Sequence, residues 1–275
     1  MPRILVIDGY DDPGIAFLAN AGASPAGELY ARLLTRLRPG CEVDIAQISR
    51  REPVAVTPGD YDGLCWTGSN MFFSASNAIV QRHIDLCAEA FAAGVPQFGS
   101  CWAAQLAAVT AGGEVDANPK GREFGLARKI TLSEAGRAHP MYRGKPDVFD
   151  GFTSHGDIIT RLPDGAQWLA GNAFTPVQAL ALSYSGGDFW AVQYHPEFDF
   201  HEIAGLAHGR RDALIAQGIF HDHDQAGQFV DEMRALDTDP SRTDLAWKYG
   251  ADDDVMDPCI KTREVQNWLD YFFND

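Results

Sequence analysis

The sequence predicts an α/β protein with a mostly parallel central sheet, helices on both faces of the sheet and a helical extension at the C-terminus. Short apolar runs alternate with longer amphipathic stretches, which is the pattern of a parallel sheet covered on both sides. One apolar run leads into a cysteine and another into a histidine. Because parallel strands end at one edge of their sheet, both side chains are expected where ligands bind.

The first hundred residues alternate regularly between expected strands and helices. The best-defined helix has leucines at positions 29, 33, 34 and 37 and stops at a Pro-Gly pair. The expected elements are a buried strand at 3–8, a helix at 25–38, strands at 41–46 and 61–66, a helix at 77–93, and a strand at 95–98 followed by a helix at 103–111.

The rest of the chain divides into two patterns. Residues 115–190 predict short strands separated by turns, for example at 128–132 and 179–183. Residues 201–275 contain amphipathic stretches and a terminal helix whose apolar face comprises Val265, Trp268, Leu269 and Phe272. We therefore expect one domain at 1–200 and a helical extension at 201–275 packed on it.

Composition predicts a cytoplasmic enzyme. A chain of 275 residues can bury a sizeable core, and a net charge of −16 repels nucleic acid and anionic membrane surfaces. The five cysteines are odd in number and scattered, which predicts reduced thiols rather than disulfides or a zinc cage. The sequence shows no leader before Arg3 and no apolar run of membrane-spanning length. No metal or other cofactor is expected.

Residues 99–105 carry the candidate nucleophile. They read Gly-Ser-Cys-Trp-Ala-Ala-Gln and lie between an apolar run and an alanine-rich stretch. A strand that enters a Gly-x-nucleophile turn and then a helix has the layout of a nucleophile elbow, which exposes the side chain of Cys101. The positive end of the following helix raises the thiolate fraction. A cysteine between small residues is also common as apolar filler, so this motif alone leaves both interpretations open.

Residues 189–198 carry the candidate base. They read Phe-Trp-Ala-Val-Gln-Tyr-His-Pro-Glu-Phe, so an apolar strand stops at His195 and Glu197 follows two residues later. A thiol nucleophile needs an imidazole to take its proton, and the imidazole needs a carboxylate to fix its tautomer and orientation. A lone His-Pro-Glu indicates only a surface turn. Combined with Cys101, it predicts a Cys101–His195–Glu197 triad.

These two motifs and two others point to a family. The chain has Gly99, Cys101 and Gln105 of a Gly-x-Cys-x-Gly-x-Gln elbow and all of a Gln-x-His-Pro-Glu segment at 193–197. With Lys-Gly-Arg-Glu-Phe-Gly at 120–125 and Thr-Ser-His-Gly-Asp at 153–157, it resembles class I (triad-type) glutamine amidotransferases, in particular the glutaminase domain of GMP synthase. The resemblance covers about residues 1–200. It implies a flavodoxin-like class I glutaminase fold and cleavage of a γ-glutamyl amide through a thioester on Cys101.

The resemblance also implies roles for other pocket residues. The backbone N–H groups of Ser69 and Trp102 would stabilise the oxyanion. Gln105 and the backbone around Ser154, His155 and Gly156 would hold the α-amino and α-carboxylate groups of the substrate, and Gly68 would also be part of the substrate-binding site. Because one imidazole suffices for the chemistry, His155 is expected to bind substrate rather than act as the base.

Two positions depart from the family pattern. The loop at 67–70 reads Thr-Gly-Ser-Asn where the family has Ser-Gly-Gly-Pro, so Ser69 takes the place of a glycine and is expected to need an unusual backbone conformation. Ala103 replaces the glycine that lets helix and strand approach closely, and its extra methyl group is expected to be tolerated with a slight shift. The first departure bears on whether the oxyanion hole is ready for catalysis.

Three polar clusters have structural interpretations. His-Asp-His-Asp at 221–224 is expected to start a helix rather than bind a metal, and the aspartates at 252–254 to form a solvated loop, since an EF-hand spacing is missing. Glu123 is expected to hydrogen-bond loop backbone near the pocket.

Three functions remain open from the sequence. The chain is either a glutaminase subunit that passes ammonia to a separate synthase, a stand-alone γ-glutamyl hydrolase or peptidase, or a binding module that has lost catalysis. The complete triad disfavours the third. Basal activity on small γ-glutamyl amides distinguishes the first from the second.

Overall fold

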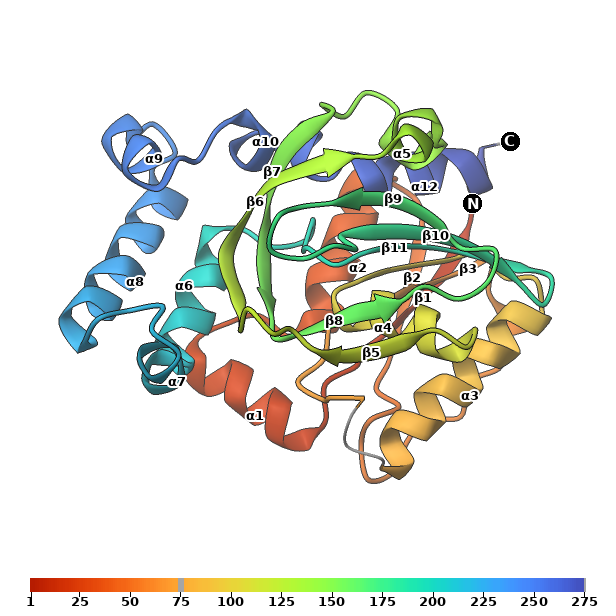
Figure 1. Cartoon of the computed structure of the whole chain (residues 1–275). Coiled ribbons are helices and arrows are strands. Elements are labelled where there is room, and N and C mark those ends of the chain that lie inside the picture. The colour runs from red at the N-terminus through yellow and green to blue at the C-terminus, as the bar shows by residue number, and fades with distance from the viewer. Residues whose placement is uncertain (74–76, 275) are drawn as a thin grey trace.

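One nine-stranded sheet organises residues 1–73 and 77–274, which the computed structural model describes (Figure 1). Its strands are β1 (Arg3–Ile7), β2 (Glu42–Ala46), β3 (Gly63–Trp66), β4 (Gln97–Ser100), β6 (Glu123–Leu132), β7 (Val148–His155), β9 (Gln167–Gly171), β10 (Ala179–Tyr184) and β11 (Gly187–Val192). The order is β2-β1-β3-β4-β11-β10-β9-β6-β7. In this order the strands from β2 to β11 pair in parallel, and the strands from β10 to β7 extend the sheet antiparallel. Strands β5 (Glu114–Ala117) and β8 (Asp157–Arg161) form a separate antiparallel pair.

Helices cover both faces of the parallel strands, as the sequence predicts. Alternate side chains of β1 point to opposite faces, so Ile4 packs with α2 (Ala26–Leu37) and α12 (Arg263–Phe273), while Leu5 packs with α3 (Ala78–Ala92) and α4 (Trp102–Thr110). Helix α1 (Asp12–Ala21) is not predicted by the sequence pattern; it begins where Asp11 accepts the N–H of Gly14, and Gly22 caps its end.

The C-terminal part of the chain is helical. The helices are α6 (Phe200–Gly209), α7 (Arg211–Ala216), α8 (His223–Thr238), α9 (Thr243–Tyr249), α10 (Asp253–Met256), α11 (Pro258–Lys261) and α12. Helices α6 and α8 bury a shared apolar cluster with α1 beyond the β6–β7 edge, and α12 returns across the molecule toward the N-terminus (Figure 1). The expected apolar face of α12 is confirmed, since Val265, Trp268 and Leu269 are buried and Phe272 packs against the same cluster. Among the described helices, none has the length and apolar character that a bilayer crossing requires.

The polar clusters at 221–224 and 252–254 both adjoin helix starts. The helix-start interpretation of the first is confirmed, because Asp222 accepts the N–H of Gln225 at the beginning of α8. The solvated-loop interpretation of the second is wrong in part, because Asp254 lies in α10 and its carboxylate accepts the backbone N–H of Asp150. That contact joins residues far apart in the sequence, which local composition does not reveal.

A buried ion pair ties α12 to the sheet. Lys145 Nζ lies 2.8 Å from Glu264 Oε1, and the two side chains are 2% and 0% exposed. Tyr194 also donates its hydroxyl hydrogen to Glu264. Because no water can solvate these charges, each depends on the other for compensation.

Replacing Lys145 with methionine is expected to lower the free energy of unfolding by about 3–5 kcal/mol, since it leaves the Glu264 carboxylate buried without its cation. Denaturant unfolding measures this loss. The double variant Lys145→Met with Glu264→Gln removes both charges, so its free energy of unfolding is expected to fall less than that of the single variant. Arg161→Met, in an exposed pair with Glu114, is the control and is expected to cost under about 1 kcal/mol. Equal losses in the single and double variants would contradict the expectation.

Candidate active site

Cys101 occupies a sharp turn between β4 and α4. Its φ of 57° and ψ of −108° lie in a region that L-residues rarely adopt, and its N–H donates to the Val192 carbonyl at 2.8 Å. This strand–turn–helix arrangement is that of a nucleophile elbow. The thiol lies at the positive end of α4, where the helix dipole favours a thiolate. Ala103 fits because its methyl group lies directly against Gly99, which has no side chain.

His195 reaches Cys101 because their strands are neighbours. Strands β4 and β11 pair in parallel, with Ser100 opposite Val192, so both residues lie just beyond the same sheet edge. The two side chains are close enough for Cys101 to act on the pKa of His195. Gly68 closes the same space, because a Cβ atom there would lie 3.1 Å from His195 Cε1 and 3.7 Å from Cys101 Cβ. A side chain at this position would therefore press on the His195 ring.

Glu197 orients the imidazole from the other side. His195 Nδ1 lies 2.7 Å from Glu197 Oε1, which also accepts the Ser100 hydroxyl at 2.9 Å. Phe198 stacks on the His195 ring at 3.8 Å between centroids. Burial lowers the pKa of His195, but the negative charges of Glu197 and of a Cys101 thiolate outweigh burial and raise that pKa to about 10. The environment therefore favours a proton on the imidazole.

The loop at 67–70 lies beside this turn. Thr67 Oγ1 donates to the Gly68 carbonyl at 2.7 Å, and Ser69 Oγ donates to the Gly9 carbonyl at 2.7 Å while accepting the N–H of Met71. The Gly68 carbonyl, which accepts the Thr67 hydroxyl, lies next to Gly9. Because the peptide between Gly68 and Ser69 is trans, the N–H of Ser69 points away from that carbonyl. Ser69 and Trp102 both line the pocket that contains Cys101.

The expected unusual conformation of Ser69 is wrong. In the part of the chain that the structure describes, the non-glycine residues with positive φ are Cys101, Lys129 and Ser185. Ser69 adopts an ordinary conformation, and its hydroxyl is engaged by the loop as donor and acceptor. The strained position is that of Cys101 instead.

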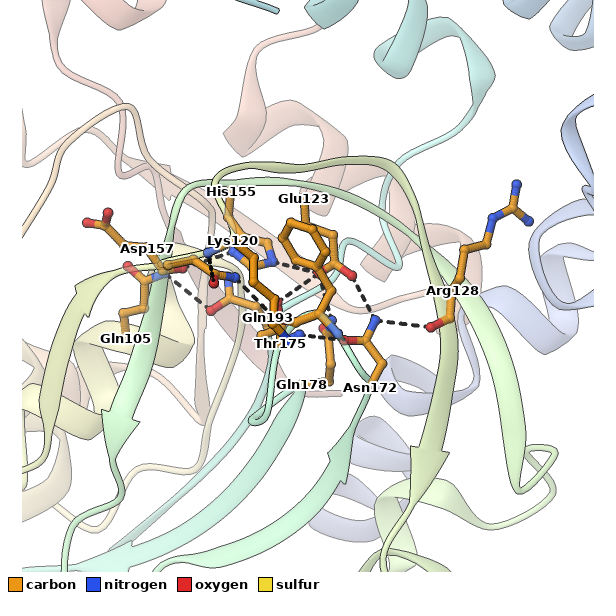
Figure 2. Close-up of polar contacts among 12 residues, drawn as sticks. Gln105, Lys120, Glu123, Arg128, His155, Asp157, Asn172, Thr175, Gln178 and Gln193 are labelled. Atoms are coloured by element: carbon orange, nitrogen blue, oxygen red, sulfur yellow. Dashed lines mark hydrogen bonds and ion pairs between the residues drawn. The ribbon is translucent and has the colours of Figure 1, made fainter. Parts of the chain in front are cut away.

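The pocket in front of Cys101 is hereafter called the candidate pocket. Its volume is about 310 Å³, and it collects most of the residues expected to bind substrate, namely Gln105, Ser154, His155 and Gly156. Gly68 lies beside Cys101 and His195 rather than in the pocket lining. Gln105 Nε2 donates to the Asp157 carbonyl at 3.0 Å and to Gln193 Oε1 at 3.2 Å, which joins α4 to the wall opposite (Figure 2).

His155 is held by acceptors at both ring nitrogens. Nδ1 lies 2.9 Å from the Asp157 carbonyl oxygen, and Nε2 lies 3.1 Å from Glu123 Oε2 (Figure 2). Glu123 also accepts hydrogen bonds from Asn172, Thr175 and Gln178. These are side chains, so the expectation that Glu123 binds loop backbone is wrong. Although burial opposes it, hydrogen bonding from His155 lowers the pKa of Glu123. With both nitrogens engaged, His155 is positioned to support the pocket wall.

Several residues around Cys101 are not predicted by the sequence motifs. Ser100 and Phe198 contact Glu197 and His195, and both could have been found from their places beside the motifs. Arg122 and Arg210 also line the candidate pocket. Arg210 lies between α6 and α7, and no local motif connects it to the elbow.

Comparisons with known proteins identify the family of this chain. A family model described as glutamine amidotransferase class-I matches residues 28–204. A γ-glutamyl-L-1-hydroxyisopropylamide hydrolase from Pseudomonas sp. is 32% identical over 98% of this chain and 92% of its own length. The GMP synthase of Nitrosomonas eutropha is 39% identical over 42% of this chain, which spans only 22% of that protein.

Among solved structures, a glutamine amidotransferase from Thermotoga maritima superposes with a TM-score of 0.67 at 15% identity, covering 100% of this chain and 99% of that one. One from Methylobacillus flagellatus has a TM-score of 0.58 at 18% identity, covering 97% and 94% of the two chains. At such identities these likenesses show the fold alone. The family match and the Pseudomonas relative go further, and the chain belongs to the class-I glutamine amidotransferase family.

Proposed function

We propose that this chain is a hydrolase that cleaves a γ-glutamyl amide through a thioester on Cys101. The arrangement of Cys101, His195 and Glu197 supports this function: a strained thiol, an imidazole and an orienting carboxylate meet at the ends of adjacent parallel strands. The reaction needs a nucleophile, a proton carrier and a group that fixes the carrier, and these three side chains can supply them.

The reaction starts with proton transfer from Cys101 to His195 Nε2. The sulfur attacks the carbonyl carbon of the γ-amide, a C–S bond forms, and the imidazolium gives its proton to the leaving amine as the C–N bond breaks. Water then loses a proton to His195 and attacks the thioester, which releases glutamate and the free thiol. Glu197 remains ionised and stabilises the imidazolium throughout.

The N–H groups of Ser69 and Trp102 are proposed to hold the oxyanion. Trp102 is the first residue of α4, so its N–H has no partner within the helix. The Gly68 carbonyl is bonded to Thr67, which supports an oxyanion hole that is ready before substrate arrives. Each such donor contributes about 3–4 kcal/mol in the transition state.

A stand-alone hydrolase is favoured over a glutaminase that waits for a synthase. A preformed oxyanion hole needs no partner to complete it, and the Pseudomonas hydrolase matches over nearly its full length. Gln105, Ser154, His155 and Gly156 are proposed to bind the γ-glutamyl group, with Gly68 shaping the space behind it. We further propose a cytoplasmic location, supported by five free cysteines, and a domain at 1–200 with an extension at 201–275.

The purified protein tests this function directly. We expect hydrolysis of glutamine, γ-glutamylmethylamide and γ-glutamyl-L-1-hydroxyisopropylamide without any added protein, with release of glutamate and the corresponding amine. Isoglutamine, which carries its amide on the α-carbon side, is the matched control and is expected to stay intact. Absence of turnover on all γ-amides would contradict a stand-alone hydrolase.

A further inference from the structure

Two arginines line the candidate pocket together with Cys101. Arg122 directly precedes β6, and its Nη2 lies 3.7 Å from where a Cβ atom on Gly156 would stand. Arg210 follows α6, beyond the residues that the family model matches, and its Nη1 donates to Ser154 Oγ at 2.5 Å. The two guanidinium groups thus reach the same wall of the pocket from distant parts of the chain.

In the described part of the chain neither guanidinium has a close ion-pair partner, although the Asp157 carboxylate lines the same pocket and acts on the pKa of Arg122. Among the described residues, no carboxylate lies within salt-bridge distance of Arg122 or Arg210, although the whole chain carries a net charge of −16. The Arg210 guanidinium instead faces the Phe17 ring at 5.4 Å. Burial and then the neighbouring Arg210 charge lower the pKa of Arg122. Two neighbouring, partly desolvated cations repel each other, and an anion bound between them would offset that repulsion.

We propose that Arg122 and Arg210 together bind a carboxylate group of the γ-glutamyl substrate. The inference rests on the proposed function and adds the chemical group that the pocket selects. Guanidinium groups bind carboxylates with paired, charge-assisted hydrogen bonds, and such groups orient a substrate as well as attract it. Because Arg210 comes from the C-terminal helices, this segment completes the substrate pocket.

A γ-glutamyl substrate can present that carboxylate in two places. One is the α-carboxylate of the glutamyl group itself, and the other is a carboxylate on the leaving amine, as in a γ-glutamyl amino acid. Both offer the same chemistry to the arginines. Ligand pairs that differ by one carboxylate distinguish them: glutamine against 4-aminobutanamide for the first, and γ-glutamylglycine against γ-glutamylmethylamide for the second.

Calorimetric titration of these four ligands into a Cys101→Ala variant measures binding without turnover. Adding Arg122→Gln or Arg210→Gln is expected to weaken binding of the carboxylate-bearing member of one pair about 10- to 100-fold and to leave its decarboxylated partner within about twofold. Arg210→Lys is expected to recover part of the loss. Arg211→Gln, which makes the same charge change one residue away, is the matched control. Thermal unfolding confirms that each variant is folded.

The outcomes separate the two proposals. Selective loss within the glutamine pair assigns the α-carboxylate, and selective loss within the γ-glutamylglycine pair assigns the leaving group. Equal weakening of all ligands, or none, by the arginine variants overturns the carboxylate role while hydrolysis by the wild-type protein stands. If the wild-type protein neither binds nor hydrolyses any γ-glutamyl amide, the proposed function itself fails.

Discussion

Replacing Cys101 with serine is expected to lower turnover of a γ-glutamyl amide by about 10⁴- to 10⁶-fold while leaving the fold intact. The hydroxyl is nearly isosteric with the thiol, but it is a much weaker nucleophile at neutral pH. The backbone conformation at φ 57° is unchanged by the substitution, so the unfolding temperature is expected to stay close to that of the wild type. Steady-state kinetics and a thermal melt give the two readouts.

Alkylation of the thiols provides an independent check of the same assignment. Burial raises the pKa of Cys65 well above its usual range and that of Cys87 to about 12, so both are expected to be inert. Cys259 is exposed and competes for reagent, so Cys259→Ser is the background for this experiment. In that background, iodoacetamide is expected to label Cys101 first, with activity lost in parallel. Labelling of Cys41 or Cys87 with activity retained would refute the assignment.

Replacing His195 with alanine is expected to lower kcat by about 10²- to 10⁴-fold, because the variant loses the group that carries the proton from thiol to leaving amine. His155→Ala is the matched histidine variant. It removes a hydrogen bond to Glu123 and loosens the pocket wall at Ser154 and Gly156. It is therefore expected to raise KM more than it lowers kcat.

Both histidine variants are measured on one substrate, with circular dichroism as a check of folding. His155→Gln retains an amide donor toward Glu123 and is expected to recover part of the KM loss. An equal collapse of kcat in His195→Ala and His155→Ala would mean that the general base has been misassigned.

Local sequence was sufficient for the elements and motifs that depend on near neighbours. The alternation of apolar runs with amphipathic stretches predicted the parallel strands and their covering helices, because side-chain periodicity reflects which face of an element is buried. The strand ends at Cys101 and His195 also predicted a shared edge. That prediction agrees with the parallel pairing of β4 and β11, since parallel strands in one sheet all end at the same side.

Local sequence was insufficient wherever a contact joins distant segments. The conformation of Ser69 depends on bonds to Gly9 and Met71, and the environment of Glu123 depends on side chains that follow it by some fifty residues. The contact between Asp254 and Asp150 joins residues about a hundred positions apart, so the local sequence does not reveal it.

The place of Arg210 in the candidate pocket also could not be predicted from local sequence. Its chain position identifies it only as a basic residue between two short helices, with no motif around it. Packing of α6 against α1 places its guanidinium beside Ser154 and in front of Cys101. The sequence by itself determined the strand–turn–helix at Cys101 and the spacing of His195 and Glu197, because those depend on local backbone preference. The charge of the pocket was decided by tertiary structure, because electrostatic interactions depend on distance in space and not along the chain.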